Sequence, residues 1–294
     1  MKDLNFAAQR ILSLALIPIF ILMSSLRAQE PTAKKEGIEK LQAYLAENPD
    51  DAVAQHDLGV LLDKAGQKDE ALTHLEMAIQ LDPGNIDYSN FYRMKIREYG
   101  HRYFDRSIQF FENMVREHPQ MIELRLNKSL SYIDKIPYPK LGIVGQGILS
   151  NKSIAELDTI LSIDPECWTA LYARAMNHLH WPRMLRHAPL AIEDFKKLIA
   201  MQKSWGPKKQ KPYFVLTYVA LGDAYVKNRA VDWEGMFTKA RATWREGLSV
   251  YPNDPELKKR LSLTDEELVK LIRKVRGLED PIDTDLSILW RPWE

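Results

Sequence analysis

The sequence of 294 residues contains a single cysteine, Cys167. One thiol cannot form an intramolecular disulfide, a cysteine zinc cluster or a CxxCH haem attachment site. Glycine and proline are also few, at 13 and 16 residues, which excludes a collagen-like or low-complexity chain. Lysine and arginine (41) nearly balance aspartate and glutamate (40), so the net charge of +1 favours neither a nucleic acid nor an anionic membrane as partner. The remaining composition is typical of a folded globular protein.

Only one long hydrophobic run is present, and it lies at the N-terminus. Residues 11–26 are mostly apolar, Lys2 and Arg10 precede them, and the small residue Ala28 follows. This order is that of a secretory signal peptide, with cleavage after Ala28. The alternative is an uncleaved membrane anchor, for which sixteen residues are short against the roughly 20 of a spanning helix. Cleavage predicts a periplasmic or secreted chain without stable membrane insertion.

The rest of the chain repeats a pattern in which a proline closes a helical stretch. These prolines are Pro49, Pro83, Pro119, Pro165 and Pro252. The clearest unit covers residues 52–85, where Leu58-Gly59 lies in a first helix and Ala71 and Ala78 lie in a second. Small residues at these positions allow two helices to approach closely, while leucines fill the space between them. The unit resembles the tetratricopeptide repeat (TPR), a helix–turn–helix motif of about 34 residues.

A second good match to this repeat lies near the other end of the chain. Tyr218, Leu221, Gly222 and Tyr225 occupy the positions of the W-x2-L-G-x2-Y pattern, with tyrosine in the first place. Between the two matches, three units are degenerate. The resemblance implies an all-α, TPR-type α-solenoid of about five units with capping helices and an extended C-terminal tail.

The expected organisation follows from these patterns. It comprises a signal peptide (1–28), an N-terminal linker (29–35), a solenoid that starts with a half-repeat (36–254), capping helices (255–277) and an aromatic tail (278–294). Thr264 and Glu267 form a capping box for the second capping helix, which is expected to run to Arg276. The apolar tail is expected to be docked, either along its own solenoid or on a partner.

By the resemblance, the first helices of TPR units line a concave groove that holds a protein or peptide. Helical spacing assigns to this groove Val53, His56, Val60, Asp63, Asn90, Met94, Arg97, Leu126, Leu130, Ile133, Tyr172, Met176, Leu179, Leu216, Val219, Asp223 and Val226. The groove is thus expected to be polar at its N-terminal end and apolar toward its C-terminal end. In the alternative interpretation, its apolar residues pack against neighbouring helices or against the chain's own tail.

Extra residues interrupt the repeat pattern at three places. They fall at 137–148, 182–189 and 229–237, each time between the first and second helix of a unit, so they are expected to project from one edge. Their large side chains include Tyr138, Leu141, Trp181, Met184, Trp233 and Phe237. Such residues either seal a lateral core or contact a partner. The glycines at 142, 145 and 147 suggest a flexible insertion.

No catalytic constellation or cofactor motif is present in the sequence. His178, His180 and His187 are the only candidates for a metal site, but residues two apart on a helix do not share a face. The sequence therefore predicts an exported, non-catalytic scaffold for protein–protein interaction or for assembly of an envelope complex. Two alternatives stay open. One is an accessory or maturation subunit of a periplasmic redox or transport complex, and the other is a metal-binding protein that uses residues 178–187.

Overall fold

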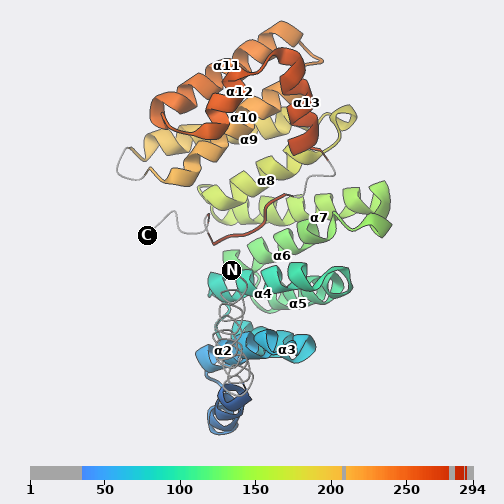
Figure 1. Cartoon of the computed structure of the whole chain (residues 1–294), viewed down its shortest axis with the longest axis vertical. Helices are drawn as coiled ribbons and strands as arrows, with labels where there is room; N and C mark the ends of the chain where they lie inside the picture. The colour runs from blue at the N-terminus through green and yellow to red at the C-terminus, as the bar shows by residue number, and fades with distance from the viewer. Residues whose placement is uncertain (1–34, 207–209, 278–281, 288, 290–294) are drawn as a thin grey trace, which may run out of the picture. The chain divides into compact units, whose positions relative to one another are not determined.

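The computed structural model describes residues 35–206, 210–277, 282–287 and 289 (Figure 1). Every regular element in these ranges is helical. The leader (1–28) and its cleavage position lie outside the described residues, as do most of the linker and Trp290 to Glu294. The chain divides into two compact units, residues 1–82 and 83–294, which are described separately below.

The described part of the first unit consists of a helix over residues 35–47, α2 (Ala52–Lys64) and α3 (Lys68–Leu81). Asp51 caps α2, because its carboxylate accepts a hydrogen bond of 2.9 Å from the amide of Ala54. A Cβ on Gly59 would lie 2.8 Å from the side chain of Leu75. The Leu-Gly pair therefore sets the distance between α2 and α3, as the repeat pattern predicts.

The described part of the second unit contains four antiparallel helix pairs, a capping pair and the docked part of the tail. Its helices are α4 (Ile86–Tyr99), α5 (Phe104–Glu117), α6 (Ile122–Lys135), α7 (Gly142–Ile163), α8 (Trp168–His180), α9 (Ala188–Ser204), α10 (Val215–Lys227), α11 (Trp233–Val250), α12 (Pro255–Ser262) and α13 (Asp265–Val275). Short 3-10 turns lie at His101–Tyr103, Pro139–Leu141, Arg183–Leu185 and Pro212–Phe214. The largest buried cluster spans α8 to α13 and contains Trp168, Phe195, Phe214 and Trp244.

The capping helices agree with their sequence signals. Thr264 accepts a hydrogen bond from the amide of Glu267, and Glu267 accepts one from the amide of Thr264, so the predicted capping box is present. Leu257, Leu268 and Ile272 pack against the α8–α11 cluster and are buried. This pair thus covers the apolar face of the last repeat, as a terminal unit must.

The flexible insertion expected at Gly142, Gly145 and Gly147 is wrong, because α7 already begins at Gly142. The 3-10 turn Pro139–Leu141 leads into this helix, and the side-chain amide of Gln146 donates to the carbonyl of Ile136 (3.2 Å). Gly147 and Trp181 line the same small cavity. Residues 142–148 are therefore the first two turns of a regular helix. Among the described helices, none combines the length and the hydropathy that crossing a bilayer requires.

Candidate binding site for an extended segment

The described part of the C-terminal tail lies across helices of its own unit (Figure 1). Residues 282–287 and 289, here called the tail segment, contact α4, α6 and α8 by hydrogen bonds and apolar packing. The surface that these helices present to the segment is called the tail-binding face below. The sequence left open whether the tail docks on its own chain or on a partner, and in this structure it docks on its own chain.

Asn90 on α4 recognises the backbone of the tail segment. Its side-chain oxygen accepts a hydrogen bond of 3.0 Å from the amide of Leu286, and its Nδ2 donates to the carboxylate of Asp285 at 2.8 Å. One side chain thus binds both a main-chain donor and the neighbouring acidic side chain. This contact fixes the position of the segment along α4.

Arg93, one turn along α4, is fully buried beneath the segment. Its guanidinium donates to Asn127 (2.8 Å), to Asp134 (2.8 Å) and to the main-chain carbonyl of Thr284 (2.5 Å). Burial lowers the pKa of Arg93, and the charge of Asp134 opposes that effect. Because a buried charge without partners is very costly, the carboxylate of Asp134 and the carbonyl of Thr284 are needed together.

The hydroxyl of Thr284 completes this polar network. It donates to Asp134 at 2.5 Å and accepts a hydrogen bond of 2.9 Å from Arg97. Thr284 is nearly fully buried, with 2% of its surface exposed. The network therefore selects a small hydroxyl side chain at this position of the segment.

Leu286 fills an apolar slot on the other side of the network. It belongs to a buried cluster whose other members are Leu126, Leu130, Leu157, Ile160, Cys167 and Ala170. Farther along, the hydroxyl of Thr169 donates to the carbonyl of Leu289 at 3.0 Å. The face thus combines main-chain hydrogen bonds with one leucine slot, which is the chemistry needed to hold an extended peptide.

The predicted groove residues divide into three groups. Those that contact the tail segment or line the cleft beside it are Asn90, Arg97, Leu126, Leu130, Ile133, Tyr172 and Met176. Those with other surroundings in the second unit are Met94, which accepts from Arg97, the core residues Leu179, Val219 and Val226, the ion-paired Asp223, and Leu216, which is exposed. Val53, His56, Val60 and Asp63 belong to the first unit.

Sequence reasoning missed Arg93, Asn127 and Asp134, which form the centre of the network. A signal was present for Arg93, because it lies three residues after Asn90 and four before Arg97, on one face of the same helix. Asn127 and Asp134 carry the same signal, three residues before and four after Leu130, but nothing in the sequence shows that they share a partner on α4.

Comparison with known proteins places this geometry on a familiar fold. Residues 35–94 match the family model of the tetratricopeptide repeat. No curated protein matches the sequence. Among solved structures, the C-terminal part of a TPR repeat-containing protein from Cytophaga hutchinsonii is 17% identical, with a TM-score of 0.51 over 72% of this chain and 74% of that one. A thermophilic TPR protein from Thermus thermophilus is 16% identical, with a TM-score of 0.48 over 72% of this chain and 97% of that one.

These similarities concern the fold alone, because both identities are low. With the helix pairs described above, the family match and the Cytophaga hutchinsonii structure confirm the predicted all-α, TPR-type α-solenoid. In TPR terms, α4, α6 and α8 are the first helices of successive units, and the tail-binding face is the surface that those first helices share.

The large side chains of the edge insertions divide between packing and exposure. Phe237 is buried, Tyr138 stacks on His101 with ring centres 4.8 Å apart, and Leu141 is partly buried. Met184 and Trp233 are 84% and 49% exposed. Packing inside the chain therefore accounts for Phe237, Tyr138 and Leu141, while contact of Met184 and Trp233 with a partner stays a prediction.

Trp181 and the histidines form a packed cluster at the end of α8. The Trp181 ring stacks on His187 at 4.0 Å, and the Nδ1 atoms of His178 and His187 lie 3.0 Å apart. His180 faces elsewhere, with its Nδ1 on the carbonyl of Met176. Within the described residues, no group of three or more His, Cys, Asp or Glu side chains is placed to hold a metal ion.

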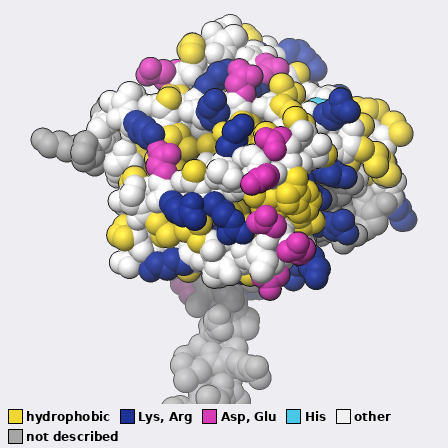
Figure 2. Space-filling model, turned by 90° about the horizontal axis from the view of Figure 1, so that it is seen from above, with side chains coloured by type: hydrophobic (Ala, Val, Ile, Leu, Met, Phe, Trp, Pro, Cys, Tyr) yellow, Lys and Arg dark blue, Asp and Glu magenta, His cyan; other side chains and the backbone are white. Residues whose placement is uncertain are grey.

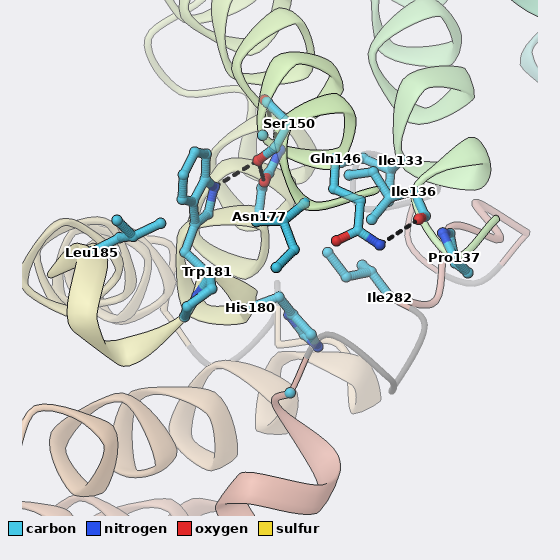
Figure 3. Close-up of a pocket in the computed structure, with 14 residues that line it drawn as sticks. Ile133, Ile136, Pro137, Gln146, Ser150, Asn177, His180, Trp181, Leu185 and Ile282 are labelled. Carbon is cyan, nitrogen blue, oxygen red and sulfur yellow. Dashed lines mark hydrogen bonds between the residues drawn. The ribbon is translucent and has the colours of Figure 1, made fainter. Parts of the chain in front are cut away.

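A cavity of about 60 Å³ lies where the tail segment begins (Figure 3). Its wall is mainly apolar, with Ile133, Ile136 and Ile282 on one side and Leu185 on the other. The Trp181 indole donates to Ser150 at 2.6 Å, and this bond closes part of the wall. The cavity has room for only a small apolar group beside the tail.

Proposed function

We propose that this protein is an exported, non-catalytic scaffold whose tail-binding face binds an extended segment of a partner protein. The observation that carries the proposal is that the face already holds such a segment. Asn90, Arg93 and Thr169 bind main-chain atoms of the tail, and main-chain bonds hold any segment of the same extended shape. The slot for Leu286 then adds selectivity for an apolar side chain.

The docked tail sets a condition on partner binding. A partner segment must displace residues 282–289, so its apparent affinity is reduced by the fraction of molecules in which the face is open. A partner with hydroxyl, acidic and leucine residues in the order of Thr284, Asp285 and Leu286 would reproduce the tail's contacts.

The first test opens the face by a change in the tail. Leu286→Asp places a charge in the apolar slot and is expected to release the tail from the full chain. A labelled peptide with the sequence of residues 282–289 should then bind at least tenfold more tightly to this variant than to the unchanged protein, as measured by fluorescence anisotropy. Leu190→Asp is the matched control, because it is the same substitution at a leucine that is 47% exposed on α9.

The binding must also map to the predicted face. Adding Asn90→Ala to the Leu286→Asp variant should abolish the gain in peptide affinity, since it removes the hydrogen bond to the peptide's main-chain amide. Equal affinity of the Leu286→Asp and Leu190→Asp variants for the peptide would contradict the proposal. Panning random peptides on the opened variant should enrich Ser or Thr two residues before Leu.

Export and a role in assembling an envelope complex are part of the proposal. They are supported by the basic start, apolar run and small residue of positions 1–28. The intact mass of the protein purified from its native host should lack residues 1–28. A mass that includes residues 1–28 would contradict cleavage and would favour an uncleaved membrane anchor at the N-terminus.

A further inference from the structure

A second surface of the larger unit has no role in the proposal above. An open depression of about 640 Å³ lies where α8, α10 and α13 end. Its lining includes six basic side chains, Arg183, Lys227, Arg229, Arg273, Lys274 and Arg276. No aspartate or glutamate is among the described residues that line it. It is called the basic depression below.

Only part of this positive charge is used inside the protein. Arg276 pairs with Asp223 at 3.0 Å, and the ammonium of Lys227 donates to the carbonyls of Leu179 (2.5 Å) and Arg276 (2.8 Å). Arg276 is thus compensated by a carboxylate, and Lys227 by carbonyls at the ends of helices, where a cation is stabilised. These contacts give no reason for the basic residues around them.

Three further basic residues lie around Lys227 and Arg276 and have no acidic partner among the described residues. Arg183, Arg273 and Lys274 are exposed and form no ion pair with any described residue. After burial, the charges of Arg183 and Arg273 are the largest causes that lower the pKa of Arg229. These guanidinium groups therefore lie close enough to repel one another, and an anion between them would relieve that repulsion.

The edge beside the basic depression carries exposed apolar side chains. They lie in the connections between paired helices or in the first turn of the helix that follows, and are Ile143 (73% exposed), Val144 (77%), Met184 (84%), Val231 (74%) and Trp233 (49%). Arg183 directly precedes Met184, and Arg229 lies two residues before Val231. Seen from the end with α11 to α13, hydrophobic side chains gather at one rim next to Lys and Arg side chains (Figure 2).

We infer that this edge is a docking surface for a membrane that contains anionic lipids. The basic depression would take phosphate headgroups, while the apolar turns and Trp233 would enter the interface between headgroups and acyl chains. A soluble phosphate compound would need only the depression and would leave five large apolar side chains in water. An acidic peptide would bind the basic residues and would give no reason for exposed apolar side chains in three separate connections. The combination of charge and apolar tips favours a membrane surface.

Vesicle flotation tests this inference. The chain from Gln29 onward is used, because it keeps every described residue and lacks the apolar leader. It should bind vesicles of phosphatidylglycerol and phosphatidylcholine and should not bind vesicles of phosphatidylcholine alone. Changing Arg183, Arg273 and Lys274 to Gln should weaken binding roughly a hundredfold, since each basic residue near an anionic surface contributes about a factor of five.

Matched controls separate this surface from general charge and hydrophobicity. Changing the exposed Lys239, Lys258 and Lys259 to Gln removes the same charge elsewhere in the unit and should leave binding nearly unchanged. Val144→Ser with Met184→Ser should weaken binding, whereas Val250→Ser, at another exposed apolar position, should not.

Three results would overturn the inference. They are equal binding to neutral vesicles, equal loss in the control lysine variant, and absence of vesicle binding together with binding of inositol hexakisphosphate or polyglutamate. The last would assign the basic depression to a soluble anion or to an acidic protein. Peptide binding to the tail-binding face is a separate readout, so failure here leaves the proposed function standing.

Discussion

Arg93 connects three parts of the molecule. It joins α4 to Asn127 and Asp134 on α6 and to the backbone of Thr284 in the tail. A guanidinium suits this role because it is planar and offers donors in several directions. Lysine would supply the charge without reaching all three acceptors.

Replacing Arg93 tests its importance for stability. Arg93→Met removes the main partner of Asp134, whose side chain is only 3% exposed, and should lower the free energy of unfolding by about 3–5 kcal/mol. Urea denaturation measures the change. Arg97→Met is the control, because Arg97 is 31% exposed and lies 3.7 Å from Asp134, so its loss should cost no more than about 1 kcal/mol. Equal losses in both variants would contradict the assigned role.

His178 gives the protein a predictable dependence on pH. Burial and the neighbouring His187 lower the pKa of His178 to about 4, against about 6.5 in an unfolded chain. The unfolded state therefore binds the proton first, and stability falls as the pH drops from about 6.5 to about 4. The full effect is on the order of 3 kcal/mol.

The contribution of His178 is measured as a difference between variants. The free energy of unfolding should differ less between pH 7 and pH 4 in His178→Gln than in the unchanged protein. The control His118→Gln should show the same difference between the two pH values as the unchanged protein. Carboxylates also titrate in this range, so only the difference between variants is diagnostic. An unchanged difference in His178→Gln would show that this histidine is not buried in its neutral form.

At the scale of single elements, the repeat positions are the most constrained. A Cβ on Gly222 would overlap the indole nitrogen of Trp244, whose ring is fully buried and donates to the carbonyl of Val219. This is the glycine of the second repeat match, and the structure shows why no side chain fits there.

Gly222→Ala should therefore destabilise the protein by about 2 kcal/mol, even though alanine favours helices over glycine by about 1 kcal/mol. Thermal or urea unfolding provides the measurement. Gly84→Ala is the matched control, because a Cβ there meets nothing within 4 Å, and it should be nearly neutral. A neutral result for Gly222→Ala would mean that α10 and α11 can separate without cost.

Local signals in the sequence were sufficient for several elements and misleading for one. Thr264 and Glu267 predicted the start of α13, because a capping box acts within a single turn. The glycines at 142, 145 and 147 suggested a flexible insertion, yet they lie in the first turns of α7. Between them, Gln146 donates to the carbonyl of Ile136 at the end of α6, a contact that glycine content does not indicate.

At the scale of the whole molecule, net charge and overall composition do not reveal the two candidate surfaces. A net charge of +1 gave no reason to expect an anion-binding surface, but folding gathers six basic side chains from α8, α10, α13 and their turns around one depression. Helical spacing likewise predicted Asn90, Arg97, Leu126 and Leu130 in a groove. It could not pair them with Thr284 and Leu286, which lie more than 150 residues later. Periodicity identifies the face of a helix, and only the folded chain shows what covers that face.

The position of the tail segment also has a consequence for biosynthesis. Thr284 and Leu286 follow α4, α6 and α8 by more than a hundred residues in the sequence, so they leave the ribosome or a translocation channel later than these helices do. Each new molecule therefore passes through a period in which its repeat helices have formed and their face is still uncovered. A partner present at that time meets no competing segment, so its capture is governed by the timing of chain emergence as well as by affinity.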